Sequence, residues 1–369
     1  MPFADELIGE HTAHALVTAI AAATPGTPLP ALRGAVGELA TRSLRERSDL
    51  LRDALLRDLP GDYQAFARTI RAARDGRVFF GGWLIWPVTS AVAAKAIDEG
   101  SVEAFDDAMA MLAELTSRLT SEFAIRGLLE HDLDRAMATV LTWTASPEED
   151  IRRLASEGTR PFLPWSKRVP AILANPSATL PVIDALYRDE SEYVRRSVAN
   201  QLNDLSRQQP EIVVQTAAGW LAEPDENTAR LVRHGLRTLV KKGHPGALEL
   251  LGFTHASTIE VDGPTLAATR IPYGGTISFT ATITNTGSLP ARLAIDYIVH
   301  HTKANGGQSG KTFKLTTATL APGERRQLSR EHSFREITTR RYYPGAHAIE
   351  LQLNGVVSGR GEFILMAAD

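Results

Sequence analysis

A glutamate between two arginines, followed by an aromatic residue, is the part of this sequence best suited to chemistry. In "DIRRLASEGTRPFLPWS" (residues 150–166), Arg153 precedes Glu157 by four positions, Arg160 follows it by three, and Trp165 lies beyond two prolines. An arginine and a glutamate four residues apart form an ordinary helix pair, so a salt-bridged structural turn is one interpretation. The other is a reactive site, in which the carboxylate stabilises a developing cation.

The same pattern recurs along the chain at intervals typical of helical repeats. "RLTSEF" begins at Arg118, "RLASEG" at Arg153, "RSVANQ" at Arg196 and "RLVRHG" at Arg230, at offsets of 35, 43 and 34 residues. Periods of this size indicate stacked helix pairs of the HEAT or armadillo kind. We expect stacking to align the four arginines in one column, although such helices also carry arginines for structural reasons.

A second column contains acids. Four residues after the arginines, one helical turn along the same face, are Glu122, Glu157, Asn200 and His234, and Asp204 lies one further turn along the third helix. Three carboxylates on one face repel one another unless a cation is expected there. The repeat register therefore predicts a surface that meets a positively charged group.

The elements that must position these residues fall into two classes. The chain up to about residue 255 is rich in Ala, Leu, Arg and Glu with helical spacing, whereas later segments such as "TISFTATITNT" alternate apolar and polar residues between turn signals. This pattern predicts a multidomain α-then-β protein. We expect an all-α HEAT-like repeat solenoid over residues 1–255 and an immunoglobulin-like β-sandwich over residues 256–369.

Composition excludes several classes of chemistry. The 369 residues include no cysteine, which rules out disulfides, thiolate zinc sites and a cysteine nucleophile and suits a reducing cytosol. The N-terminus has no basic segment, so we expect no signal peptide. Gly81, Gly82 and Pro87 interrupt the most apolar run, which we interpret as a buried helix rather than a membrane span. No metal-ligand spacing or nucleotide-binding motif is present, so we expect no metal and no cofactor.

A basic stripe follows the acidic positions. Arg230, His234, Arg237 and Lys241 have 4, 3, 4 spacing, which places them on one face of a helix. Such a stripe can follow a phosphate backbone, although a solvated helix face is the alternative. Basic residues around an acidic centre suit DNA that carries a positive charge at the centre of the contact.

At this point the sequence resembles a known family. "LTSEFAIRGLL", "RRLASEGTRPFLPW" and "YVRRSVANQLNDLSRQQP" look like the AlkC branch of the HEAT-like-repeat DNA glycosylases, the bacterial DNA-3-methyladenine glycosylases. The motifs span roughly residues 115–210, and "SEGTRPFLPW" is the most diagnostic because generic HEAT repeats lack it. A subset of this family has an immunoglobulin-like domain after the helical one, and the first hundred residues match less distinctly.

The resemblance implies roles for individual residues. Glu157 and Asp204 would be the main catalytic pair and Glu122 the third member. Trp165 would contact the lesion or its sugar through a cation–π interaction, its alternative being a core tryptophan. The DNA phosphates would be bound by the basic residues Arg153, Arg160, Arg196, Arg230, Arg237 and Lys241.

The resemblance also implies a reaction. We expect a cytoplasmic monomer that hydrolyses the N-glycosidic bond of cationic alkylated bases in double-stranded DNA, chiefly 3-methyladenine and also 3-methylcytosine, by bending the DNA without full base flipping. No lysine occupies an evident Schiff-base position, so we expect a monofunctional enzyme. "TTRRYYPG" or "HHTKANGGQSGK" in the β-sandwich would add DNA contacts, unless that domain only stabilises the protein. The alternative for the whole chain is a non-catalytic HEAT-repeat scaffold that binds DNA or protein.

Overall fold

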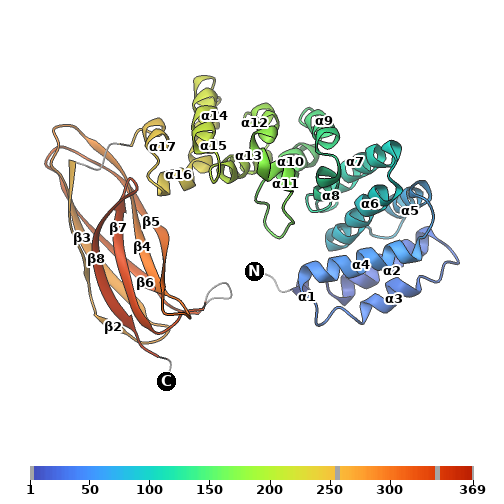
Figure 1. The fold of residues 1–369 in the computed structure, drawn as a ribbon, viewed down its shortest axis with the longest axis horizontal. Helices are drawn as coiled ribbons and strands as arrows, with labels where there is room; N and C mark the ends of the chain where they lie inside the picture. Colours follow the sequence, from blue (N-terminus) through green and yellow to red (C-terminus); the bar gives the residue numbers. More distant parts are fainter. Residues whose placement is uncertain (1–3, 254–257, 337–340, 368–369) are drawn as a thin grey trace. The chain divides into compact units, whose positions relative to one another are not determined.

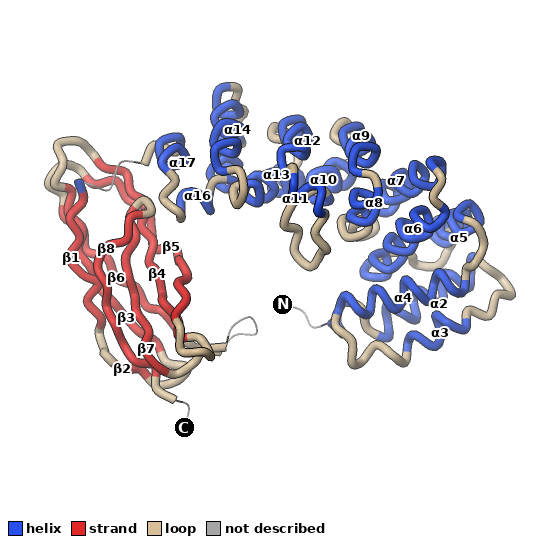
Figure 2. The backbone as a smooth tube through the Cα atoms, viewed as in Figure 1, coloured by secondary structure: helices blue, strands red, loops and turns tan. Residues whose placement is uncertain are grey.

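The structure is a computed structural model that describes residues 4–253, 258–336 and 341–367. Its first part is helical and its second part is built from strands (Figure 2). The last helix ends at Leu250 and the first strand begins at Ile259. The predicted change from helices to strands near residue 255 is therefore confirmed.

The helices have the following bounds: α1 Ala4–Leu7, α2 Glu10–Ala23, α3 Pro30–Val36, α4 Leu44–Asp58, α5 Tyr63–Asp75, η1 Gly82–Leu84, α6 Ile85–Glu99, α7 Val102–Thr116, α8 Ile125–His131, α9 Leu133–Trp143, α10 Glu149–Gly158, α11 Pro170–Ala174, η2 Pro176–Thr179, α12 Leu180–Leu186, α13 Glu192–Leu205, α14 Pro210–Ala222, α15 Thr228–Gly235, α16 Arg237–Lys241 and α17 Pro245–Leu250. The chain divides into two compact units. One contains Met1–Gln209 and Gly219–Gly235, and the other contains Pro210–Ala218 and Leu236–Asp369, so α16 and α17 group with the strands.

The first unit is a stack of helices in chain order (Figure 1). Helix α6 packs on α4 and α7, α10 packs on α7 and α13, and α13 packs on α15. Ion pairs join neighbouring repeats at intervals of 36 and 37 residues: Arg71 Nη2 lies 2.9 Å from Asp107 Oδ1, and Arg152 Nε lies 2.7 Å from Asp189 Oδ2. These intervals match the repeat period expected from the sequence.

Local sequence signals explain where several of these helices begin and end. Ser43 and Glu46 form a reciprocal capping box at α4, and the Asp62 carboxylate accepts from the N–H of Ala65 at α5. Gly100 ends α6 with a φ of 72°, which a glycine adopts without strain. The apolar run that contains Pro87 forms η1 and α6. Across the described ranges, every helix is too short or too polar to cross a membrane.

The second unit contains two packed sheets. One has the order β1-β3-β6 and the other the order β2-β8-β7-β4-β5. The strands have the following bounds: β1 Ile259–Leu266, β2 Arg270–Ile271, β3 Thr276–Asn285, β4 Ala291–Thr302, β5 Gln308–Leu320, β6 Arg325–Ser333, β7 Gly345–Leu353 and β8 Val356–Leu365. Pairing is antiparallel except between β2 and β8.

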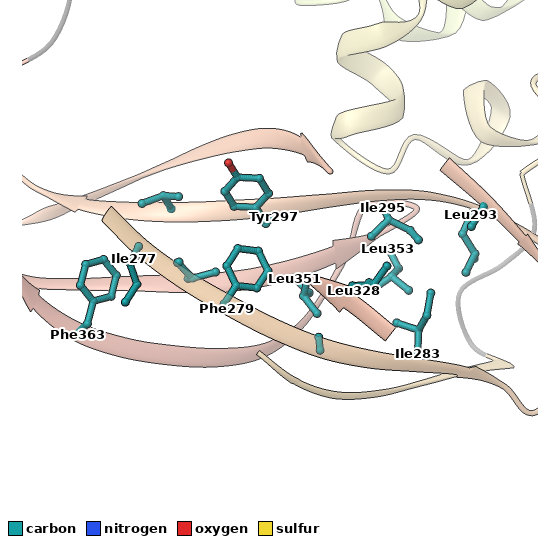
Figure 3. Packing of buried hydrophobic residues seen from close by; sticks show 14 of the residues in the cluster. Ile277, Phe279, Ile283, Leu293, Ile295, Tyr297, Leu328, Leu351, Leu353 and Phe363 are labelled. Carbon is teal, nitrogen blue, oxygen red and sulfur yellow. The ribbon is translucent and has the colours of Figure 1, made fainter. Parts of the chain in front are cut away.

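The core between these sheets consists of the alternating residues that the sequence predicts. Phe279 on β3 lies 5.3 Å from Tyr297 on β4 between ring centroids, and Leu351 and Phe363 are buried beside them (Figure 3). "HHTKANGGQSGK" forms the ends of β4 and β5 with a tight turn, in which the N–H of Lys303 donates to Gly307 O. "TTRRYYPG" lies partly outside the described residues.

Candidate functional site

The site is built mainly on two packed helices, α10 and α13. Helix α10 buries Leu154 and Ala155 and carries Glu157 near its C-terminal end. Its last residue is Gly158, where an added Cβ would lie 2.8 Å from Ile125 Cγ2, so only a glycine allows α8 to approach this closely. Helix α13 turns a corresponding apolar face inward and carries Asp204 in its last turn.

Glu122 reaches the same place from outside a regular helix. Helix α7 ends at Thr116, so "RLTSEF" lies in the connection to α8, and the expectation that it occupies a repeat helix is wrong. Arg118 faces elsewhere: its Nη1 donates to Phe80 O at 3.1 Å. Glu122 is nevertheless 91% buried beside α10, where it lies with the other predicted carboxylates.

The three carboxylates and two arginines form one alternating chain of ion pairs, which we call the carboxylate chain. Arg153 pairs with Glu122 and approaches Glu157, with 3.8 Å between its Nη2 and Glu157 Oε1. Arg160 joins Glu157 to Asp204, at 2.5 Å from Nη1 to Glu157 Oε1 and 2.9 Å from Nε to Asp204 Oδ2. The prediction that Glu122, Glu157 and Asp204 lie together is therefore confirmed.

Arg160 is placed differently from a surface phosphate ligand. Only 7% of the residue is exposed, and its guanidinium donates to two carboxylates. Burial disfavours its charged form, but Glu157 and Asp204 outweigh burial and raise the pKa of Arg160. Its geometry is that of a group that positions the two acids. Arg153 is more accessible, and its guanidinium lies 5.1 Å from the centre of the Tyr193 ring.

Hydroxyl groups donate to two of the three acids. Ser197 Oγ donates to Glu157 Oε2 at 2.7 Å and accepts from Ser156 Oγ at 2.6 Å, which ties α13 to α10. Thr120 Oγ1 donates to Glu122 Oε2 at 2.9 Å. The sequence interpretation did not single out these hydroxyls. The only sequence signal for Ser197 is its position in the motif "RSVANQ", about two helical turns before Asp204.

The carboxylate chain has a net charge of −1 when its three acids and two arginines are all ionised. Burial raises the pKa of Glu122, and the opposing effect of Arg153 is too small to cancel it, because Glu157 adds repulsion. In a low-dielectric site the three acids attract a cation strongly, an effect that the two paired arginines and the nearby buried Arg126 offset in part. The arrangement can therefore stabilise positive charge that develops on a bound molecule.

Arg126 on α8 organises the segment that follows α10, and sequence reasoning missed it. The residue is fully buried and donates to three backbone carbonyls: Nη1 to Gly158 O and Arg160 O, and Nε to Lys167 O. Burial, with smaller contributions from neighbouring arginines, lowers the pKa of Arg126 to about 10. The sequence feature that could have indicated a role for Arg126 is its position in "LTSEFAIRGLL", four residues after Glu122.

Trp165 lies on this segment and is 46% exposed, so the interpretation of a core tryptophan does not apply. Its backbone has a φ of 59°, and its carbonyl accepts from Arg45 on α4. Tyr193 at the start of α13 is a second exposed aromatic residue, 43% accessible, beneath Arg153. Exposed aromatic rings are suited to contacts with bases or sugars, and Tyr193 lies next to the carboxylate chain through Arg153.

The remaining predicted phosphate ligands do not form one helical stripe. Arg230 is exposed on α15, where its Nη2 lies 2.7 Å from Glu192 Oε1, and Arg196 is exposed on α13. The helix is interrupted at Leu236, so Arg237 and Lys241 belong to α16 in the second unit. The expectation of a single continuous basic stripe is therefore wrong, because α15 ends at Gly235, before Arg237 and Lys241.

One further pair of residues that the repeat register predicts as neighbours is in contact. Asn200 and His234, predicted as neighbours in the second column, are joined at 3.1 Å between Asn200 Oδ1 and His234 Nε2. In the described part of the chain, no group of three or more His, Cys, Asp or Glu side chains is arranged to hold a metal ion. Two arginines pair with the three acids of the carboxylate chain.

Comparison with known proteins now identifies relatives. The family model "Uncharacterised protein YhaZ, C-terminal Ig-like domain" matches residues 260–367. "Uncharacterized protein YhaZ" of Bacillus subtilis (strain 168) is 33% identical over 321 residues, 87% of each chain. The Pseudomonas fluorescens alkylpurine DNA glycosylase AlkC, solved bound to DNA containing an abasic site analog, matches 99% of this chain and all of its own, with 33% identity and a TM-score of 0.89. This chain, with helical repeats followed by an Ig-like domain, therefore belongs to the AlkC family.

Proposed function

We propose that this protein is a monofunctional DNA glycosylase that hydrolyses the N-glycosidic bond of cationic alkylated bases, chiefly 3-methyladenine and also 3-methylcytosine. The observation that carries the proposal is the carboxylate chain, in which Glu122, Glu157 and Asp204 are buried together with one excess negative charge. The likeness to the Pseudomonas fluorescens enzyme along the whole chain supports the same class of substrate.

The chemistry suits these side chains. Alkylation at N3 makes the base cationic, so it leaves with the electron pair of the glycosidic bond without being protonated. Positive charge then develops on the sugar, and a carboxylate that is already in place stabilises it without reorganisation. Water attacks C1′ of the sugar, and its proton passes to a carboxylate and then to solvent. The products are a neutral base and an abasic site.

Arginines have different tasks in this proposal. Arg160 holds Glu157 and Asp204 in fixed positions, while the more accessible Arg153 is suited to reach a phosphate beside the lesion. Among the described residues, the cations paired with the three acids are both arginines, which cannot form a Schiff base. This supports hydrolysis without strand cleavage, and borohydride trapping of the enzyme on DNA should give no adduct.

DNA contacts extend beyond the acids. Arg196, Arg230, Arg237 and Lys241 remain candidates for phosphate binding, and the hairpin between β4 and β5 adds Lys303 and Lys311. We propose a monomer that bends double-stranded DNA to reach the lesion, in the cytoplasm at the bacterial nucleoid. Replacing both hairpin lysines with glutamine should lower the slope of log affinity against log salt by about 2. An unchanged slope would assign the β-sandwich a purely structural role.

The decisive experiment measures base release. Purified protein is incubated with methylated genomic DNA, and the released bases are separated by chromatography against a heated, protein-free control. Release of 3-methyladenine well above the control is the expected result, and none above it would refute the proposal. Binding to DNA without any release would instead favour a HEAT-repeat scaffold.

A further inference from the structure

The first unit contains a cavity that the proposed reaction does not use. It has a volume of about 310 Å³ and lies between α4, α6, α8 and the segment that carries Trp165. This volume is at the lower end of the range of about 300–1,000 Å³ typical of small-molecule sites. None of the three acids of the carboxylate chain lines it, so the cavity is distinct from the place where the sugar cation is stabilised.

Aromatic rings and small side chains line this cavity. Trp86 and Phe123 stack with 4.1 Å between ring centroids and 23° between their planes, and Trp165 adds an exposed ring. Ala94 and Gly127 leave the space beside these rings open, and a Cβ added at Gly127 would meet only ordinary van der Waals contacts. A flat aromatic molecule would be bound by stacking.

Cations predominate among the charged residues at the cavity. Arg45, Arg52 and Lys167 line it together with one acid, Asp49. Arg52 pairs with two acids, at 2.6 Å from Asp49 Oδ1 and 2.8 Å from Asp53 Oδ1, and Lys167 pairs with Glu130. Arg45 is exposed and donates to the carbonyl of Trp165, and within the described ranges no ion pair joins it to a carboxylate. An anionic group is therefore best placed near Arg45.

The cavity and the candidate active site are built from the same segments of the chain. Phe123 follows Glu122 in the chain, and the Lys167 carbonyl accepts from Arg126, which also fixes the backbone of Arg160. A ligand in the cavity would thus contact the same two segments that position the carboxylate chain. It would lie beside the lesion rather than in its place.

We propose that this cavity binds one undamaged nucleotide of the substrate DNA, displaced from the base stack next to the lesion, with its base against Trp86 and Phe123 and its phosphate near Arg45. The inference rests on the proposed function. Its physical basis is the combination of stacked rings, an exposed arginine that no ion pair neutralises in the described part of the chain, and a volume at the lower end of the small-molecule range. Capture of this nucleotide would stabilise bent DNA without any pocket for the lesion base.

Photo-crosslinking can identify the occupant. A set of duplexes carries an uncleavable abasic analogue and 5-iodouracil at one neighbouring or opposite position at a time, and a further duplex carries 5-iodouracil on an uncleavable sugar at the lesion position. After near-ultraviolet irradiation, mass spectrometry locates the crosslinked residue. We expect one undamaged position to crosslink to Trp86, Phe123 or Trp165. Free deoxynucleotide added in excess tests whether an unlinked nucleotide competes for the cavity.

Two variants and a control test the contact by function. Ala94→Leu fills the cavity and Arg45→Gln removes its exposed cation, whereas Arg57→Gln changes an exposed arginine on the same helix outside the cavity. Each of the first two should lose the crosslink and weaken DNA binding about ten-fold, while single-turnover release at saturating DNA stays near wild type. Arg57→Gln should retain the crosslink and its affinity.

Three results would overturn the inference: no crosslink at the cavity from any undamaged position, a crosslink to Trp86 or Phe123 from the lesion position, or loss of the DNA crosslink when free deoxynucleotide is added in excess. Retention of the crosslink in both variants would also overturn it. Base release by the wild-type protein is measured in parallel. Normal release without the crosslink rejects only the nucleotide site, whereas absent release rejects the proposed function.

Discussion

Glu157 lies at the centre of the carboxylate chain, and Glu157→Gln tests the reasoning most directly. The substitution keeps the shape of the side chain and removes one charge, so the cluster changes from a net −1 to neutral. Ser197 can still donate to the amide oxygen, and Arg160 keeps its contact of 2.9 Å with Asp204. The fold should therefore survive, and the loss should be electrostatic.

The size of the loss follows from the geometry. Two unit charges about 4 Å apart interact by about 4 kcal/mol at an effective dielectric constant of about 20, and each 1.4 kcal/mol corresponds to a factor of about ten in rate. Some of this is recovered by rearrangement of the two arginines. We expect single-turnover release of 3-methyladenine to slow by roughly 100- to 1,000-fold, as for other preorganised electrostatic groups.

The assay pairs this variant with Glu149→Gln, which changes an exposed glutamate in the first turn of the same helix. That control should release the base at the wild-type rate. DNA affinity of Glu157→Gln should be equal to or higher than that of the wild type, because a buried negative charge is removed near phosphates. Release within a few-fold of wild type by Glu157→Gln and Asp204→Asn alike would show that the carboxylate chain is not the catalytic site.

Three other predictions concern pH, ion pairing and packing. Burial raises the pKa of Glu122, so the rate of base release should fall as the pH drops through a pKa above that of an ordinary glutamate. In Glu122→Gln this fall should move to lower pH. An unchanged pH profile would show that Glu122 does not control the rate. Arg160→Met removes the cation between two buried acids, leaving Asp204 without its pair and Glu157 with only the longer contact to Arg153. It should destabilise the protein by about 3–5 kcal/mol, seen as a Tm at least about 6 °C lower, whereas Arg230→Met at an exposed pair should change the Tm little. Gly158→Ala places a Cβ 2.8 Å from Ile125 and should cost about 1–3 kcal/mol, and a wild-type Tm would show that α8 moves aside freely.

Periodicity determined the elements of this protein. Alternating residues such as Phe279 and Tyr297 had to face a core, because side chains on a strand alternate between its two faces. The spacing of "RLASEG" and "RSVANQ" likewise placed α10 and α13 as equivalent helices, with Glu157 and Asp204 on neighbouring faces. Such features depend on residues close together in the chain, so they can be inferred without coordinates.

Tertiary structure decided what the charged residues do. The local sequence around Arg160 suggests an arginine that faces solvent. The packing of α10 on α13 instead buries its side chain between two acids. Glu122 joins the site from a connection rather than a helix, and the break at Leu236 divides a stripe that spacing alone would make continuous. Burial, ion pairing and the cavity beside Phe123 arise from the approach of segments that are distant in the chain. The sequence shows which residues carry charge. Only the packing shows which of these charges lack an ion-pair partner, and the chemistry of the site depends on those charges.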